Sequence, residues 1–472
     1  MDTIDHFKLG IVRGVSYGVF GPPSVFMPEV RALGATVSRI YLTWNQVEPE
    51  PGRYDWTAVD ALLAQLDPAD QVWVTVVSAS RWATVVPTDF LPASSAKDMT
   101  AYRLFVAALV AHCGGSISYW QCNNEPSNAG LWSGSAEAYA AQADVFAKAV
   151  RSADRSAAIV LGGCGYDVLS APLESEPRKF FDTVLARSGD AFDLFDVHLY
   201  DDPRKIPGRI ADVRAMMRRH GTERHVVVGE YGGPTLLGFP KLEPVMQQVM
   251  IEAFSGQGPA IDSGELAQQA ETPDRKAMRA LYGKMASLPP QLQMFMQGCP
   301  PELEAKRHRI AVREIMTRNL LAMAEGVKLT MCWNLAPEVP NYRDPYNLMG
   351  FLSDKLALMD FEGNALSRLE PAAHTFKLLA GLLQGATQVR RLAAAAGVTA
   401  LEIDRGESGL VHALWAEGDA FDGEQQPVRS ISWPWPEHTA TLIDAFGVAQ
   451  PTELRDGRLA LSLSVTPLLV TA

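Results

Sequence analysis

The sequence predicts an α/β protein: a (β/α)8 barrel with a helical insertion after its seventh strand, followed by a C-terminal antiparallel β-sandwich. Three observations lead to this prediction. Short apolar runs alternate with longer amphipathic segments from residue 10 to about residue 384. One connection between a strand and its helix is much longer than the others. After residue 389 the amphipathic segments stop and only short strand-like runs remain.

The barrel prediction rests on eight runs rich in Val, Ile, Leu and aromatic residues. Strands are expected near residues 11–18, 36–43, 71–78, 116–122, 158–164, 193–199, 225–230 and 328–334. These runs lack strict alternation, which is typical of parallel strands buried on both faces. Helices are expected between them, for example over Trp56–Leu66, Met99–His112, Ala136–Ala153 and Arg204–Arg219. The catalytic barrel is therefore predicted to occupy residues 1–384.

The long connection covers about residues 234–301 and follows the seventh strand. It looks helical and is rich in methionine, including Met278, Met294 and Met296. One interpretation is a packed helical subdomain with a small core of its own. The other is a lid over the barrel mouth, because insertions at the carboxyl ends of barrel strands lie on the active face.

The C-terminal residues 385–472 read as a small β-sandwich. Strands are expected over Val398–Ile403, Gly409–Trp415, Ser430–Trp433, Thr439–Ile443 and Leu459–Val470. Turn signals such as Asp422-Gly423 and Asp456-Gly457 separate some of them. Trp415, Trp433 and Trp435 could form a ligand-stacking face, but packing is the favoured role for them.

Composition narrows the functional classes. With 47% hydrophobic and 20% charged residues, the chain has the profile of a folded soluble protein. A net charge of −12 and the lack of a basic stripe argue against nucleic acid, and no apolar run is long enough to predict a membrane span. Five cysteines without metal-type spacing, and no signal segment at the start, favour a cytoplasmic setting. A secreted chain without its signal peptide would look the same, and a homo-oligomer is compatible with this composition.

Two glutamates stand at the ends of strand-like runs. Glu125 closes the apolar part of Ser118–Pro126, and Glu230 closes that of His225–Gly233. A carboxylate is costly to hold beside a core, so each needs a reason to be there. Because the carboxyl ends of barrel strands meet at one mouth, both would face a common substrate. Glycoside hydrolysis requires such a pair, and two chance ion-pair partners are the weaker explanation.

The barrel portion, roughly residues 10–384, resembles the retaining glycoside hydrolases of clan A, with most similarity to family 39 and its relatives. The resemblance is carried by Asn124-Glu125-Pro126 on the fourth strand, Glu230 on the seventh, His198-Leu199-Tyr200 on the sixth and Trp333 on the eighth. The stretch Trp44–Trp56 recurs more loosely across the clan. The third strand ends without the histidine that some relatives carry, and Asn123 stands where family 39 members often have tryptophan. These departures leave the sugar open.

The resemblance implies a role for each matching residue. Glu125 would protonate the leaving group and then activate water, while Glu230 would attack the anomeric carbon. Asn124 would donate a hydrogen bond to the sugar 2-hydroxyl. The surrounding residues would assist: Tyr200 and Arg39 would hold Glu230, Trp333 would form a floor for the sugar, and His198 would line the pocket or satisfy core groups. Trp44, Trp82 and Tyr231 follow strand ends and are candidates either for substrate contact or for packing.

The leading hypothesis is an exo-acting retaining glycoside hydrolase for a β-linked oligosaccharide or glycoside, which needs neither cofactor nor metal. A second hypothesis is a metal-dependent sugar isomerase or epimerase, in which Glu125, Asp196, His198 and Glu230 surround a divalent cation. The alternation of Asp196 and His198 on one strand face keeps it open. A third is a carbohydrate-binding protein without catalysis.

Overall fold

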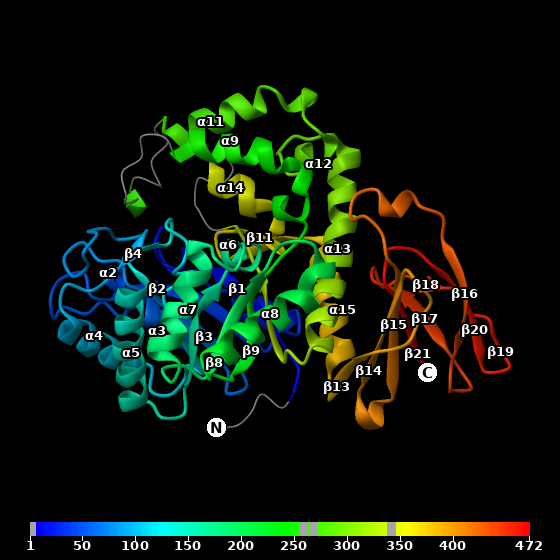
Figure 1. Ribbon diagram of the computed structural model, residues 1–472, viewed down its shortest axis with the longest axis horizontal. Helices are drawn as coiled ribbons and strands as arrows, with labels where there is room; N and C mark the ends of the chain where they lie inside the picture. Colours follow the sequence, from blue (N-terminus) through cyan, green and yellow to red (C-terminus); the bar gives the residue numbers. More distant parts are fainter. Residues whose placement is uncertain (1–5, 255–261, 265–270, 338–345) are drawn as a thin grey trace.

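The computed structural model describes residues 6–254, 262–264, 271–337 and 346–472. A closed barrel of eight parallel strands forms its body (Figure 1). The strands are β1 (Lys8–Gly14), β2 (Val37–Thr43), β3 (Gln71–Val77), β5 (Tyr119–Cys122), β7 (Ala158–Cys164), β8 (Leu194–Leu199), β9 (His225–Tyr231) and β10 (Leu329–Trp333). They follow one another around the wall in chain order, and β10 closes the ring against β1. The predicted barrel is confirmed.

Helices flank the barrel, one after each of its strands. They are α1 (Met27–Ala32), α3 (Thr57–Leu63), α4 (Met99–His112), α5 (Ala136–Ala153), α7 (Glu176–Ser188), α8 (Ile206–Arg219), α13 (Pro301–Ala324) and α15 (Pro371–Leu383). Side chains fix where some of them begin: Asp98 accepts a hydrogen bond from Thr100 N at 2.7 Å before α4, and Ser135 accepts one from Ala138 N at 3.2 Å before α5. Both helices therefore have the limits that the sequence predicted.

Further short elements belong to the connections that leave the carboxyl ends of the strands. They are α2 (Trp44–Val47), β4 (Ala93–Ser94), β6 (Trp132–Ser133), α6 (Tyr166–Leu169), η1 (Pro203–Lys205), α14 (Leu348–Ser353), η5 (Asp354–Leu356), β11 (Met359–Glu362) and β12 (Ala365–Leu369). The chain thus concentrates its irregular structure at one face of the barrel, where such folds place their active sites. Among the described helices, none has the length and apolar character needed to cross a membrane.

The insertion lies above the carboxyl-end face of the barrel (Figure 1). Its elements are η2 (Leu236–Gly238), η3 (Pro240–Leu242), α9 (Glu243–Phe254), α11 (Pro273–Tyr282), η4 (Met285–Ser287) and α12 (Pro290–Gln293). They share a hydrophobic core that includes Met278, Leu292 and Met294. The helical character was expected from the sequence, and a core of its own was one of the two interpretations that the sequence left open.

The C-terminal residues form two antiparallel sheets, as predicted. One contains β13 (Gln388–Arg391), β14 (Val398–Asp404), β15 (Leu410–Ala416), β21 (Leu468–Thr471), β17 (Thr441–Asp444) and β18 (Ala449–Gln450), and the other β16 (Arg429–Pro434), β20 (Arg458–Leu463) and β19 (Leu454–Arg455). The single strand expected over Leu459–Val470 is wrong. The chain bends before Pro467, so β20 and β21 belong to different sheets.

The sandwich contacts both the barrel and the insertion through the loop between β15 and β16. Phe421 of this loop is buried in the core of the insertion, under Lys306 Nζ at 3.8 Å from its ring centre. Glu424 accepts hydrogen bonds at 3.0 Å from both Arg309 Nε and Arg313 Nη1 of α13. Trp433 is buried and donates to His412 Nδ1 at 3.0 Å, which fits the packing role favoured for it.

Candidate active site

The barrel interior holds a fully buried arginine beneath its mouth. Arg39, on β2, carries five N–H donors and makes five hydrogen bonds. Its partners are Thr75 Oγ1 at 3.0 Å, Gly229 O at 2.9 Å, Glu230 Oε1 at 3.1 Å, Gln121 Oε1 at 2.6 Å and Asn124 Oδ1 at 2.8 Å. Burial lowers the pKa of Arg39, but Tyr41 and Glu230 outweigh it and raise that pKa above its ordinary value. The guanidinium therefore stays charged and directs its donors at the ends of β5 and β9.

Glu230 is surrounded by donors on both oxygens. Oε1 accepts from Tyr41 at 2.5 Å as well as from Arg39, and Oε2 accepts from Tyr200 at 2.7 Å. Burial, with the nearby charge of Glu230, raises the pKa of both phenols well above the usual range, so they remain protonated donors. These three donors fix the position and orientation of the Glu230 carboxylate, as a group that must attack a single atom requires.

Glu125 reaches the mouth through an unusual turn after β5. Asn123 has φ 57° and Glu125 has φ 40°, so both backbones lie in the left-handed region that residues other than glycine rarely adopt. Asn123 ties this turn to the end of β3, since its Oδ1 accepts from Ser78 N at 2.7 Å and from Ser78 Oγ at 3.0 Å. The turn aims the Glu125 carboxyl into the barrel, where 15% of the side chain remains exposed.

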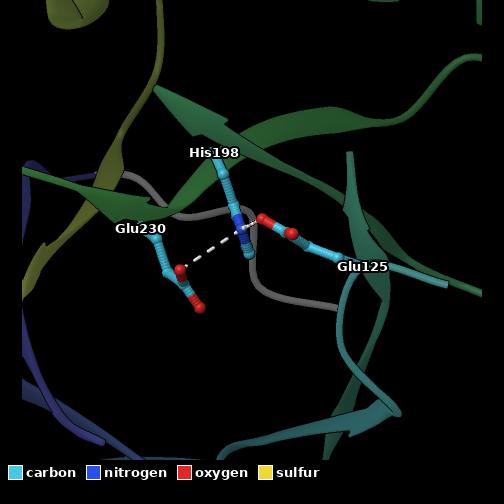
Figure 2. Close-up of side chains that lie close together, drawn as sticks. All are labelled: Glu125, His198 and Glu230. Atoms are coloured by element: carbon cyan, nitrogen blue, oxygen red, sulfur yellow. Dashed lines mark hydrogen bonds and ion pairs between the residues drawn. The ribbon is translucent and has the colours of Figure 1, made fainter. Parts of the chain in front are cut away.

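His198 lies between the two glutamates (Figure 2). Its Nδ1 is 2.6 Å from Glu125 Oε1 and 3.3 Å from Glu230 Oε2, and its Nε2 is 3.1 Å from Asp196 Oδ2. Burial lowers the pKa of His198, but the three carboxylates more than offset this and raise it to about 10. At neutral pH the ring is thus an imidazolium that donates to Glu125 and Asp196.

Two glycines make room for this arrangement. A Cβ on Gly163 would lie 2.3 Å from His198 Nε2, and one on Gly229 would lie 2.2 Å from Asp196 Oδ1. Instead the Gly229 N–H donates to Asp196 Oδ1 at 2.6 Å. Neither ring nor carboxylate could take its position beside a larger residue.

The two glutamates are close enough for joint action on one bond. One carboxylate oxygen of Glu125, one of Glu230 and a ring nitrogen of His198 all lie within 4.8 Å of one another. Carboxyl groups about 5–5.5 Å apart allow one to attack while the other transfers a proton, whereas about 6.5–9.5 Å leaves space for an intervening water. The short separation fits direct attack by a carboxylate.

The same three groups have the types and spacing of metal ligands. In the structure His198 forms a hydrogen bond with Glu125 and an ion pair with Glu230, and the raised pKa of His198 means that its Nδ1 carries a proton at neutral pH. A metal would have to displace that proton before the imidazole could bind it.

Most of the site residues predicted from the sequence meet here: Arg39, Asn124, Glu125, His198, Tyr200 and Glu230. Trp333, at the end of β10, contacts Tyr41 edge to face with ring centres 6.5 Å apart, so its contact with substrate stays a prediction. Tyr41 itself was missed. It lies two residues after Arg39 on β2, and the alternation of side chains along a strand would have placed both on the same face.

For two of the further candidates the structure shows packed surroundings, the alternative that the sequence left open. Trp44 is fully buried, with its ring stacked on Phe105 and its Nε1 donating to Glu48 at 2.8 Å, because α2 turns it into the core. Tyr231 follows Glu230 directly, so its side chain points away from the barrel interior and is 2% exposed. Trp82 is half-buried against Trp44 and donates to Glu48 O at 2.9 Å, and its contact with substrate stays a prediction.

The fold, a closed parallel barrel followed by two antiparallel sheets, is similar to that of solved glycoside hydrolases. A family 39 glycoside hydrolase from Bacteroides cellulosilyticus WH2 has a TM-score of 0.61 at 14% identity, over 99% of this chain and 81% of that one. The family 51 α-L-arabinofuranosidase AbfB from Bifidobacterium longum has a TM-score of 0.56 at 12% identity, over 99% and 95%. A glucosidase from Croceicoccus marinus has a TM-score of 0.55 at 13% identity, over 99% and 95%. No family model matches the chain, and no curated protein matches its sequence. At such identities the likeness shows the fold.

The charge of His198 predicts a pH dependence of stability. The pKa of His198 in the folded protein is about 10, above the 6.5 of an ordinary histidine. Its contribution is therefore complete below pH 6.5 and is lost as the pH rises through about 10. Between pH 7 and 9 the free energy of unfolding should fall more steeply in the wild type than in His198→Asn, by up to about 1.4 kcal/mol per pH unit. Melting temperatures across this range measure the difference, and equal slopes would contradict the assignment.

Proposed function

We propose that this protein is a retaining glycoside hydrolase that works by double displacement. The observation that carries the proposal is the pair of glutamates with oxygens within 4.8 Å, one of them bound by Arg39, Tyr41 and Tyr200. Glu230 attacks the anomeric carbon while Glu125 protonates the departing oxygen. Water then enters, gives a proton to Glu125 and releases the sugar from Glu230.

The charges around the pair support this change of role. While Glu230 is ionised, its negative charge favours a proton on Glu125. Once Glu230 is esterified to the sugar that charge is gone, and Glu125 more readily acts as a carboxylate base. The imidazolium of His198, 2.6 Å from Glu125 Oε1, favours the same ionised form. The site therefore uses one carboxyl first as acid and then as base without moving it.

Asn124 is positioned to recognise the sugar. Its Oδ1 accepts from Arg39 at 2.8 Å, which fixes the orientation of the amide. Its Nδ2 makes no hydrogen bond within the ranges that the structure describes, so this donor is available to a 2-hydroxyl group. We assign Trp333 as the aromatic floor of the central subsite, because it stands beside Tyr41 at the end of β10. The likeness in fold supports a β-linked substrate, or its stereochemical equivalent in an α-L-arabinoside.

Exo-action on short substrates is supported by the path of the insertion. It leaves β9 and reaches the connection after β3, on the opposite side of the barrel. There Asp262 Oδ1 accepts from Asp89 N at 3.0 Å, while Ser263 N and Oγ donate to the Asp89 carboxylate at 2.7 Å and 2.8 Å. An element tied down on both sides of the mouth acts as a lid, and a long polysaccharide could not lie across it.

The catalytic assignment is tested with a panel of aryl glycosides. Glu230→Ala should lose about four orders of magnitude in kcat on every substrate, because no nucleophile remains. Glu125→Ala should keep activity on substrates with good leaving groups and should gain activity with azide, which replaces the activated water. Glu402→Gln, in the sandwich, is the control and should retain full activity. Undiminished turnover in either alanine variant contradicts the roles, and sugar binding without any hydrolysis would indicate a binding protein.

The lid is tested with Asp89→Ala, which removes the acceptor for Ser263. The rate on an oligosaccharide of ten or so units should rise several-fold relative to that on an aryl glycoside. Asp190→Ala changes an exposed carboxylate before β8, at the other end of the barrel, and serves as the control. An unchanged ratio in Asp89→Ala would argue against a lid.

A metal-dependent sugar isomerase is the second candidate, since the ligand-like spacing of Glu125, His198 and Glu230 favours it. It predicts loss of activity after dialysis against EDTA and recovery with Mn²⁺ or Mg²⁺. The hydrolase predicts activity that EDTA leaves unchanged, so assays of aldose–ketose interconversion and of aryl glycoside cleavage, each with and without EDTA, separate the two.

A further inference from the structure

A third carboxyl group lies beside Glu125 and has no part in the mechanism above. Asp167 belongs to α6, directly after β7, and its Oδ2 accepts from Ser127 Oγ at 2.7 Å. Its Oδ1 is shielded from solvent and accepts no well-aligned hydrogen bond within the described part of the chain. The backbone N–H groups of Asp167 and Val168, in the first turn of α6, also favour the charged form of this carboxyl.

The position of Gly165 shows how close the two carboxyl groups are. A Cβ placed on Gly165 would be 2.9 Å from Asp167 Oδ1 and also 2.9 Å from Glu125 Oε1. These two oxygens therefore border the same small space and lie no more than twice that distance apart. Burial raises the pKa of Asp167; the hydrogen bond from Ser127 opposes this, and the charge of Glu125 adds to it.

The charges facing Glu125 act in opposite directions. The imidazolium of His198 favours loss of the proton from Glu125, whereas Glu230 and Asp167 favour its retention. Tyr200 and Cys164, the other titratable groups nearby, are neutral because burial holds their pKa values well above the usual range. Glu230 is already bound to Arg39 at 3.1 Å. Asp167 makes no ion pair among the described residues, so its charge acts on Glu125 without being neutralised by a partner.

We propose that Asp167 is a positioning residue that keeps the acid proton on Glu125 until the glycosidic bond breaks. It balances the imidazolium on the other side of the carboxyl, and its Oδ1 offers an acceptor to the protonated form through a bridging water. The inference rests on the proposed function and deepens it, since it explains how a general acid survives 2.6 Å from a protonated histidine. Asp167 acts through Glu125 and does not touch the substrate.

The test is the pH profile of kcat/KM for Asp167→Asn, which keeps the shape and the contact with Ser127. On an alkyl or phenyl glycoside, whose poor leaving group needs the acid, the basic limb should move down by about one pH unit. On a dinitrophenyl glycoside, which needs no acid, kcat/KM should change less than twofold. Asp167→Glu retains the charge and should restore the wild-type limb to within a few tenths of a pH unit.

Asp193→Asn is the control, because this mostly buried carboxylate pairs with Arg151 at 3.1 Å at the opposite end of the barrel. Asp193→Asn should leave the basic limb of the kcat/KM profile at the pH of the wild type. Asp167→Ser, a smaller neutral residue, replaces Asp167→Asn if that variant does not fold. An unmoved limb in a folded neutral variant, or an equal change with both leaving groups, overturns the proposal. If the wild type cleaves no glycoside, or Glu125→Ala is unimpaired, the proposed function itself fails, and that result is distinct from either outcome for Asp167.

Discussion

The buried guanidinium of Arg39 is the constraint on which the site depends. A charge without partners in a barrel interior would be destabilising by several kcal/mol, so the surrounding strands must supply acceptors. They do so from β3, from β5 and its following turn, and from β9. Arg39 can reach all of these acceptors only when the strands pair in one particular register. The arginine that orients Glu230 and Asn124 therefore also fixes the frame in which they stand.

Around Arg39, positively and negatively charged side chains lie next to one another inside the barrel. Arg39 and His198 face Glu125, Asp196 and Glu230, and the imidazolium contacts all three carboxylates. The protein's own side chains make all of these contacts, so the fold itself orients the electric field at the mouth. The absence of a side chain at Gly163 and Gly229 is what allows such dense packing of polar groups.

The sequence predicted the barrel because its hydrophobic runs are regular, and it predicted the glutamate pair because strand ends have a known place in such a fold. The direction in which a side chain at a strand end points was harder to predict. Trp44 and Tyr231 also follow strand ends, yet both point into packing. Tyr41 looked like an ordinary aromatic strand residue, and only its alternation with Arg39 could have shown its role. Asp167 lies in a helix of four residues that no periodicity marks, and its nearness to Glu125 arises from tertiary structure alone.

The loop that carries Phe421 and Glu424 links the sandwich to the elements above the mouth of the barrel. Phe421 completes a core formed with the insertion, α13 and α14, and Glu424 binds α13, the helix into which the insertion leads. The accessory domain is therefore not a separable module. A chain that ended before β13 would leave an opening in the insertion's core and would remove the Glu424 partner of Arg309 and Arg313 on α13.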